Sequence, residues 1–166
     1  MIDVARYEAD LAVRFRKSGA PLPDADLLSN LPLNPYATPD IAAGIKTPAD
    51  ILQHRLLQDR NGDTWAQWFA RAGGAAPGEP KPPGWRLSVN LAIEAAIAGQ
   101  GVILCGSDLV LDSEARGELV KCFDVPLHLG AYFLVQRQGG LRNRAVRAFR
   151  DWLIEATAAL RVSGET

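Results

Sequence analysis

Residues that commonly carry catalytic chemistry are few and scattered in this 166-residue sequence. Its two histidines, His54 and His128, stand in no recognisable catalytic motif, and Gly106-Ser107 lacks the rest of a nucleophile elbow. Gly99-Gln100-Gly101 follows an expected helix, whereas a phosphate-binding loop must open one. The acidic residues show no metal-ligand spacing. The sequence therefore predicts a protein that is not an enzyme and that holds no metal or other cofactor.

Composition and charge narrow the class of protein further. A formal net charge of −1 at pH 7 offers no global attraction to nucleic acid or to an anionic membrane. No apolar run approaches the roughly 20 residues that cross a bilayer, and the charged N-terminus does not resemble a secretory signal. Cys105 and Cys122 lie in apolar segments and are expected to be reduced core residues. We expect a soluble, cytoplasmic protein without membrane contact.

The stretch over residues 86–106 is expected to organise the chain as a βαβ unit. Leu87 to Val89 favour a strand, an alanine-rich helix follows, Gly99 or Gly101 ends it, and residues 102–105 form a second, apolar strand. Ser88 and Asn90 stand at the helix start. They could cap free backbone N–H groups only, or they could help to bind a small anion there.

The first half of the chain predicts several further elements. A short helix is expected over residues 1–8 and a buried strand over 10–15. A strand is expected over 27–33, which Pro32 confines to a sheet edge or to a place where the strand leaves the sheet. Residues 34–39 must be extended, because two prolines restrict the residues before them, and they are the best candidate for a crossing between lobes. Thr47 is expected to cap a helix that ends near His54, and a short strand should follow over residues 55–58.

Another helix is expected over residues 65–72, with Trp65, Trp68 and Phe69 as a core stripe. The second half of the chain then predicts strands over 119–123 and 127–136 and a final helix over 142–160. The apolar residues of that helix should line one face, with the charged residues largely off it: Ala145, Phe149, Trp152, Leu153, Ala156 and Leu160. Its arginines could bind nucleic acid, although interleaved acidic residues favour an ordinary solvated face. Helices alternate with short apolar strands throughout, so the fold class is α/β with largely parallel sheets.

Six segments, taken together and in order, resemble the effector-binding domain of LysR-type transcriptional regulators, in the branch related to the glycine-cleavage activator. They span nearly the whole chain: residues 10–14, the crossing with Thr38-Pro39, residues 65–68, the stretch 87–102, residues 117–120 and residues 146–153.

The resemblance implies a two-lobed fold like the periplasmic binding proteins, with two crossing strands near residues 34–39 and 131–135. The first lobe would comprise residues 1–35 and 133–166, and the second lobe residues 36–132. A small-molecule effector, expected to be a carboxylate, would bind in the cleft between the lobes. The resemblance and the ends of the expected strands and helices suggest these effector-binding residues: Arg14, Phe15, Thr38, Ser88, Val89 and Asn90. For Arg14 a surface or inter-lobe ion pair is the alternative.

The resemblance also implies what the chain lacks. Regulators of this family carry a helix-turn-helix domain, through which alone DNA would be bound, and an opening strand-helix-strand unit. This sequence begins after both, so the first lobe is expected to be incomplete. Dimer formation is possible. The alternative to effector sensing is a truncated interaction or oligomerisation module without effector binding, which would use the unpaired sheet edge of the first lobe.

Overall fold

The computed structural model describes residues 9–17, 24–59, 64–73, 84–137 and 140–161. The chain divides into two compact units: residues 1–31 with 128–166 form unit 1, and residues 32–127 form unit 2. The expected lobe boundaries, after residues 35 and 132, fall inside strands β3 (Leu33–Ala37) and β8 (Ala131–Gln136), each of which belongs whole to one unit. The helix expected over residues 1–8 lies outside the described residues.

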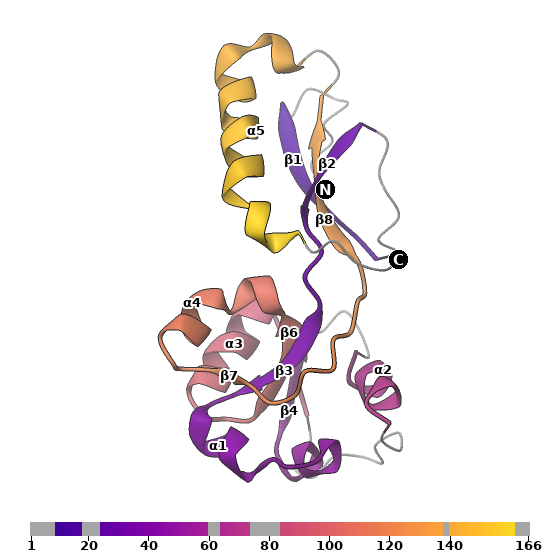
Figure 1. Ribbon diagram of the computed structural model, residues 1–166, viewed down its shortest axis with the longest axis vertical. Coiled ribbons are helices and arrows are strands. Elements are labelled where there is room, and N and C mark those ends of the chain that lie inside the picture. The colour runs from indigo at the N-terminus through magenta and orange to yellow at the C-terminus, as the bar shows by residue number, and fades with distance from the viewer. Residues whose placement is uncertain (1–8, 18–23, 60–63, 74–83, 138–139, 162–166) are drawn as a thin grey trace. The chain divides into compact units, whose positions relative to one another are not determined.

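Unit 1 contains a three-stranded antiparallel sheet (Figure 1). Strands β1 (Leu11–Arg16) and β2 (Ala25–Ser29) flank β8, and both run antiparallel to it. β2 ends before Pro32, which lacks the N–H group that a ladder needs. The expectation that β1 is buried was wrong, since the side chains of Val13 and Phe15 are 54% and 47% exposed. The expectation that it is a parallel strand was also wrong, because β8 pairs with it in antiparallel register.

Helix α5 (Arg144–Ala156) lies along this sheet (Figure 1), between the short 3-10 turns η4 (Gly140–Arg142) and η5 (Ala158–Leu160). Asn143 caps its start, where its side-chain oxygen accepts a hydrogen bond from the Ala145 N–H at 3.0 Å. α5 has no buried residue, and the side chains of Phe149 and Trp152, two members of the expected apolar face, are 52% and 58% exposed.

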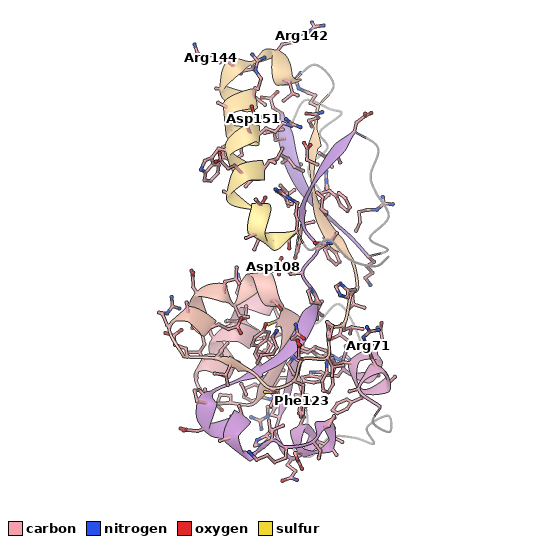
Figure 2. The ribbon with its side chains drawn as sticks, in the orientation of Figure 1. Arg71, Asp108, Phe123, Arg142, Arg144 and Asp151 are labelled. Carbon is pink, nitrogen blue, oxygen red and sulfur yellow. The ribbon has the colours of Figure 1, made fainter. Side chains whose placement is uncertain are left out.

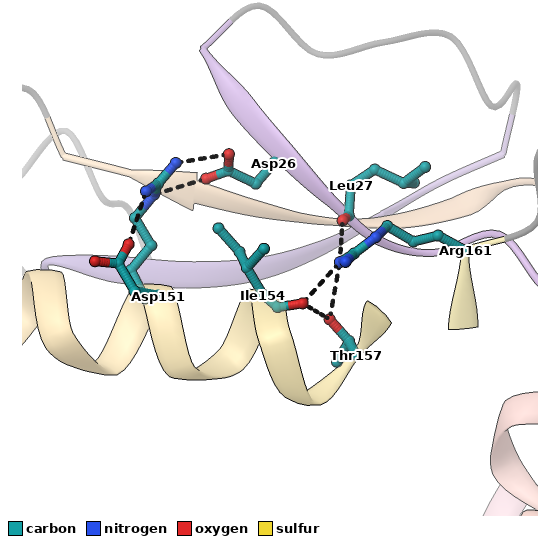
Figure 3. Close-up of polar contacts among 7 residues, drawn as sticks. Asp26, Leu27, Asp151, Ile154, Thr157 and Arg161 are labelled. Carbon is teal, nitrogen blue, oxygen red and sulfur yellow. Dashed lines mark hydrogen bonds and ion pairs between the residues drawn. The ribbon is translucent and has the colours of Figure 1, made fainter. Parts of the chain in front are cut away.

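Polar contacts join α5 and its C-terminal extension to β2 (Figure 3). Arg150 donates from Nε and Nη2 to the two carboxylate oxygens of Asp26, at 2.8 and 2.7 Å. Arg161 donates from Nη1 to the carbonyl oxygen of Leu27 at 3.3 Å and to that of Ile154 at 2.9 Å. Arg150, which the sequence pattern placed on the outer face, therefore faces the sheet.

Unit 2 is built on a five-stranded mixed sheet in the order β5-β4-β6-β3-β7. β4 (Leu56–Asp59), β5 (Trp85–Leu87) and β6 (Val102–Gly106) are parallel, whereas β3 is antiparallel to β6 and to β7 (Val120–Lys121). The expectation of largely parallel sheets thus holds for these three strands only. The helix between β5 and β6, α3 (Val89–Ile97), confirms the βαβ unit, with β4 lying between its two strands.

The remaining helical segments of unit 2 lie around this sheet. Figure 1 shows α3 and α4 (Leu111–Ala115) along one side of the sheet and α2 (Thr64–Arg71) along the other. The other helical segments are α1 (Pro39–Gly44), η2 (Pro48–Gln53) and η3 (Ser107–Leu109). The capping box that opens η2 confirms Thr47 as its cap, and the helix ends at His54 as expected.

Both sides of the unit 2 sheet are packed against apolar side chains. On the α3 side the buried cluster consists of Tyr36, Leu57, Ala92, Ala96, Ile103, Cys105, Val110 and Leu119. On α2, the expected core stripe is confirmed, because Trp65, Trp68 and Phe69 are all buried. Both indole N–H groups find partners: Trp65 donates to the Leu57 carbonyl oxygen and Trp68 to that of Val125, at 3.2 and 2.9 Å.

Glycines set the end of α3 and the start of β6. Gly99 has a φ of +70°, the left-handed conformation that commonly ends a helix. Gly101 has a φ of +155°, and a Cβ there would overlap the carbonyl oxygen of Arg55. That carbonyl accepts a hydrogen bond from the Val102 N–H at 2.9 Å, so the close approach starts the pairing of β6 with β4. The expected strand Leu87 to Val89 ends earlier than predicted, since the helix begins at Val89.

Candidate functional site

The carboxyl ends of the three parallel strands meet at one end of the unit 2 sheet. The register of β5 with β4 and of β4 with β6 brings Leu87, Asp59 and Gly106 to this end. β3 starts here too, because Leu33 pairs with Gly106, and Leu127 forms a bridge to Leu33. The chain therefore enters and leaves unit 2 at the carboxyl ends of its parallel strands, which is where α/β sheets commonly bind ligands.

Ser88, Val89 and Asn90 lie together at this end, at the start of α3. Ser88 is the N-cap residue, with extended backbone angles of φ −64° and ψ 149°, but its side chain makes no capping hydrogen bond. Its carbonyl oxygen accepts the first helical bond, from the Ala92 N–H at 3.0 Å. Ser88 and Val89 are half-buried and Asn90 is exposed. The cap-only interpretation of Ser88 was therefore wrong, and the hydroxyl is available for another partner.

A second group of polar side chains, from β3 and the residue after β6, lies at the same end of the sheet. Ser107 Oγ accepts hydrogen bonds from Asn34 Nδ2 at 3.0 Å and from the Tyr36 hydroxyl at 2.9 Å, and it donates to the Pro32 carbonyl oxygen at 3.1 Å. The backbone N–H of Ser107 donates to the same carbonyl at 3.0 Å. These bonds use the one donor and both acceptor sites of the hydroxyl. Asp108 follows at this end of unit 2 (Figure 2).

Burial shapes the chemistry of this polar group. Burial raises the pKa of Tyr36 to about 12, so its hydroxyl stays a protonated donor at neutral pH. Asn34 is 1% exposed, and its Oδ1 accepts no hydrogen bond from the part of the chain that the structure describes. In the assigned amide orientation, Asn34 Nδ2 faces Ser107 Oγ. Asn34 Oδ1 is therefore an open acceptor on the α3 side of the sheet.

Thr38 is separated from the α3 start. It is the N-cap residue of α1 and follows β3 at the end of the sheet opposite to Ser88. Four strand residues separate it from the level of Leu87, which is about 13 Å, and three strand spacings, about 14 Å, separate β3 from β5. One small ligand cannot contact Thr38 and Ser88 together.

Arg14 and Phe15 belong to β1 of unit 1, where they pair with Phe133 and Tyr132 of β8. Successive strand residues point to opposite faces of a sheet, so these two side chains do not share a face. Phe15 is exposed and its ring lies 5.0 Å from that of Tyr132, whereas Arg14 is half-buried. The strand of Arg14 pairs with β8 in antiparallel register, which departs from the expectation of largely parallel sheets.

The residues that often carry redox or metal chemistry were also located. Cys105 is buried and Cys122 half-buried, both are free thiols, and burial raises the pKa of each, that of Cys122 to about 11. Among the described residues, no three His, Cys, Asp or Glu side chains form a group that could hold a metal ion. No helix in the described ranges is both long and apolar enough to span a membrane.

Sequence reasoning missed Asn34 and Ser107. It treated Asn34 as part of an extended crossing and considered Ser107 as part of an incomplete nucleophile elbow, yet their hydrogen bond joins residues 73 positions apart. The available signal was position: Ser107 directly follows the buried strand β6, and residues that follow parallel strands gather at one end of the sheet.

Comparison of this chain with known proteins identifies its family. Residues 1–158 match the family described as "LysR substrate binding domain", and the chain therefore belongs to that family. The expected fold class is confirmed, because the chain matches solved effector-binding domains with the two-lobed, periplasmic-binding-protein-like α/β fold.

Individual relatives are more specific. The AmpR effector-binding domain of Citrobacter freundii matches with a TM-score of 0.79 and 29% identity, over 96% of this chain and 80% of that one. The AmpR effector domain of Pseudomonas aeruginosa matches with a TM-score of 0.76 and 33% identity, over 95% and 77%. The HTH-type transcriptional activator AmpR of Enterobacter cloacae is 33% identical over 159 residues, which are 93% of this chain and 53% of that protein.

The chain thus spans about half the length of the curated relatives it matches. Those relatives are transcriptional regulators, which agrees with the expectation of a non-enzyme. LysR-type transcription regulation is the activity of the family to which the chain belongs.

Proposed function

We propose that this chain is the ligand-sensing part of a LysR-type regulator and that the start of α3 binds a small-molecule effector. One observation supports the proposal: in a chain of the substrate-binding family, the start of α3 has polar groups that are not used in capping the helix. The Ser88 side chain makes no capping hydrogen bond, and the backbone N–H groups in the first turn of α3 have no partners within the helix. These groups support Ser88, Val89 and Asn90 as effector contacts.

The chemistry of a helix start favours a carboxylate effector. Free N–H groups point along the helix axis, and the helix dipole adds a partial positive charge at the same place. The Ser88 hydroxyl and the Asn90 amide can add side-chain donors beside them. Asn34 Oδ1 lies at the same end of the sheet, about three strand spacings from β5, and would accept a donor from an effector large enough to reach it.

In unit 1 we propose Arg14 as an effector contact, on the chemistry of its guanidinium, which can bind a carboxylate through two hydrogen bonds. Phe15 remains a prediction from the family resemblance. Thr38 also remains a prediction, and since it lies at the far end of the unit 2 sheet it cannot act in the contact made by Ser88. The branch of the glycine-cleavage activator remains a prediction too.

Regulation of transcription requires a DNA-binding segment in addition to a sensor. The AmpR relatives are named HTH-type, and they are about twice as long as the matched part of this chain. We propose that DNA is bound through such a helix-turn-helix domain in a longer regulator, acting in the cytoplasm as a dimer. Effector binding would then act by favouring one arrangement of the regulator over another.

A thermal-shift screen with an alanine variant tests the proposed effector contact. The chain is heated with small carboxylates, amino acids and aromatic acids, and a ligand that binds only the folded state must raise the melting temperature. The double variant Ser88→Ala/Asn90→Ala should lose that shift and keep the ligand-free melting temperature within a few degrees. Gln53→Ala is the matched control, at an exposed position of η2 outside the proposed contact, and should keep the shift.

Two results would contradict the proposal. A ligand shift that survives the double variant would exclude the start of α3 as the contact. A folded chain that responds to no member of the screen, and shows no chemical-shift change in the α3 amides, would exclude effector sensing by this chain.

The alternative function is an interaction or oligomerisation module without effector binding. The exposed side chains of β1 favour it, since Val13 and Phe15 are about half exposed on a strand that lies at the edge of its sheet. Light scattering during size-exclusion chromatography tests it. A chain that stays monomeric at high concentration, and that fails to bind an intact homologue, would exclude this function.

A further inference from the structure

After α5, the chain of unit 1 folds back along the end of strand β2. Residues 157–161, which we call the C-terminal strap, comprise the 3-10 turn η5 with one residue on each side of it. The carbonyl oxygen of Leu160 accepts a hydrogen bond from the Asn30 N–H at 3.2 Å. Arg161 donates from Nη1 to the carbonyl oxygen of Leu27 at 3.3 Å. The strap therefore bonds to β2 and to the first residue after it.

A bulge in β2 brings both of these backbone groups to the strap. Leu27 lies opposite Phe133 of β8 and Ser29 lies opposite Tyr132, so β2 holds one extra residue at this place. In a regular strand the polar groups of successive residues point to alternate sides, and those of residues 27 and 30 would point apart. The extra residue returns them to the same side. Because β2 is an edge strand, that side is open to the strap.

The side chain of Arg161 joins the strap to α5 as well as to β2 (Figure 3). Its Nη1 donates to the carbonyl oxygen of Ile154 at 2.9 Å and to Thr157 Oγ1 at 3.3 Å. Ile154 belongs to the last turn of α5, where carbonyl groups lack partners within the helix and a basic side chain can supply one. One guanidinium thus holds together the end of α5, the strap and the edge of β2.

Asn30, which the strap holds, is followed directly by the connection from unit 1 to unit 2. Unit 1 ends at Leu31 and unit 2 begins at Pro32. The carbonyl oxygen of Pro32 accepts hydrogen bonds from the Ser107 N–H at 3.0 Å and from its hydroxyl at 3.1 Å. The chain is therefore anchored in unit 1 by the strap and in unit 2 by Ser107. A single residue, Leu31, lies between these two anchors, and its N–H donates to the hydroxyl of Ser29 at 3.5 Å.

The second connection between the units has more residues between its anchors. Leu127 is bridged to Leu33 in unit 2, and Ala131 pairs with Arg16 in unit 1. Residues 128–130 lie between them. The first connection is thus the shorter of the two, and its anchor in unit 1 is the strap.

We propose that the C-terminal strap is a positioning device that restricts the first connection between the two units. Arg161 holds the strap against β2, the strap holds Asn30, and Asn30 limits the movement of Leu31. Loss of the Arg161 contacts would free the Asn30 N–H and leave Leu31 anchored on the unit 2 side only. Displacing the strap would then loosen the connection between the units. This device does not depend on the proposed effector contact, because none of its residues lies at the start of α3.

Amide hydrogen exchange of the 166-residue chain, followed residue by residue by NMR, tests the hold on Asn30. Arg161→Ala should speed exchange of the Asn30 amide at least about tenfold, since exchange at a site that opens locally follows the free energy of opening. Arg161→Lys keeps one donor and should give an intermediate rate. The Leu33 amide, which bonds to the Leu127 carbonyl oxygen in unit 2 at 2.9 Å, should not change. Arg147→Ala is the matched control, because Arg147 is an exposed arginine of the same helix, and it should leave both rates unchanged.

Backbone ¹⁵N relaxation of the same variants tests the effect on the connection itself. Arg161→Ala should lower the order parameter of the Leu31 amide, for which values below about 0.6 indicate flexible backbone, and Arg147→Ala should not. Exchange of the β8 amides separates this release from a general loss of stability, because β8 is the central strand of the sheet and should keep its protection. Thr157→Val is a milder second variant that removes one acceptor of Arg161, and it should give a smaller change in the same direction.

Three outcomes would overturn the proposal. Unchanged exchange at Asn30 in Arg161→Ala would show that the strap does not hold the start of the connection. An equal rise across the β8 amides would show that Arg161 supports the general stability of unit 1 instead. Faster exchange at Asn30 with no change in the order parameter of Leu31 would show that the strap covers the edge of β2 without restricting the connection.

Discussion

The two units differ in how completely their own residues cover their apolar side chains. In unit 2, helices on both sides of the sheet bury a continuous core, in which Trp68 is fully buried and hydrogen-bonded. In unit 1, the sheet has three strands, α5 has no buried residue, and Trp152 is 58% exposed. Two tryptophans on amphipathic helices thus stand in opposite environments. The described residues of unit 2 bury their own apolar side chains, whereas α5 of unit 1 leaves Phe149 and Trp152 exposed.

Replacing each of the two tryptophans by alanine should give the largest difference in the free energy of unfolding. Trp68→Ala leaves a cavity among Trp65, Phe69 and Phe123 and removes the bond to Val125, so it should lower the free energy of unfolding by about 3–5 kcal/mol. Trp152→Ala should change it by about 0.5 kcal/mol or less, because an exposed side chain has little burial to lose.

Urea unfolding, followed by circular dichroism, measures the free energy of unfolding of both tryptophan variants. Amide hydrogen exchange assigns each loss to a unit, since the two units need not unfold together. Equal losses for both variants would show that unit 1 buries Trp152 as unit 2 buries Trp68, and the contrast would fail.

Ser107 is the next largest expected effect, and it tests whether unit 2 depends on polar as well as apolar contacts. Ser107→Ala leaves the Tyr36 hydroxyl and Asn34 Nδ2 without their acceptor, both in buried positions, and should cost about 2–3 kcal/mol in unfolding free energy. Tyr36→Phe should cost about 1 kcal/mol. The double variant should cost less than the sum, because both changes remove the same bond. Additive losses would contradict a shared network.

The pair Asp26 and Arg150 is the corresponding polar anchor of unit 1. It is bidentate, but the side chains of Asp26 and Arg150 remain 29% and 24% exposed, so Asp26→Ala should cost only about 1 kcal/mol. Asp151→Ala is the control, since that carboxylate is 61% exposed, and it should have almost no effect. Thermal unfolding in low and high salt measures both, and the Asp26 effect should shrink as salt rises. If Asp26→Ala lowered the free energy of unfolding as much as Ser107→Ala does, the polar contacts of the two units would not differ in strength.

Local patterns predicted the elements well, whereas contacts between distant residues were not predictable from one sequence. The tryptophan stripe of α2, the capping box at Thr47 and the glycine stop at Gly99 each depend on neighbours within a few residues. The rotation of α5 does not: a 3.6-residue period shows a wide apolar arc but not which part of it faces the sheet. The structure places Arg150 on the side of α5 that faces the sheet, where it pairs with Asp26, 124 positions away in the sequence, and Trp152 lies outside.

The same limit applied to the candidate site. Ser88, Val89 and Asn90 were found because a helix start is a local signal, and the structure keeps them together. The strand directions were not evident from sequence, so Thr38 was grouped with them although the antiparallel course of β3 carries it to the other end of the sheet. The hydrogen bonds of Ser107 were missed for the same reason, since they join β3 to the end of β6.

Asp50 gives the smallest expected effect and tests a purely local contact in unit 2. Backbone N–H groups of Thr47 and Lys46 donate to its carboxylate at 2.7 and 2.9 Å, and these bonds hold the pKa of Asp50 below its ordinary value. Because the folded-state pKa is lowered, the contribution to stability is present above the unfolded-state pKa and is lost as pH falls through the folded-state value. An NMR titration of the Thr47 amide should therefore show a midpoint below that of an unstructured aspartate. Asp50→Asn should abolish this titration. It should leave the Trp68 environment unchanged, because residues close in the sequence stabilise η2, whereas residues far apart in the sequence form the core. A midpoint at the ordinary value would show that the capping box does not persist in solution.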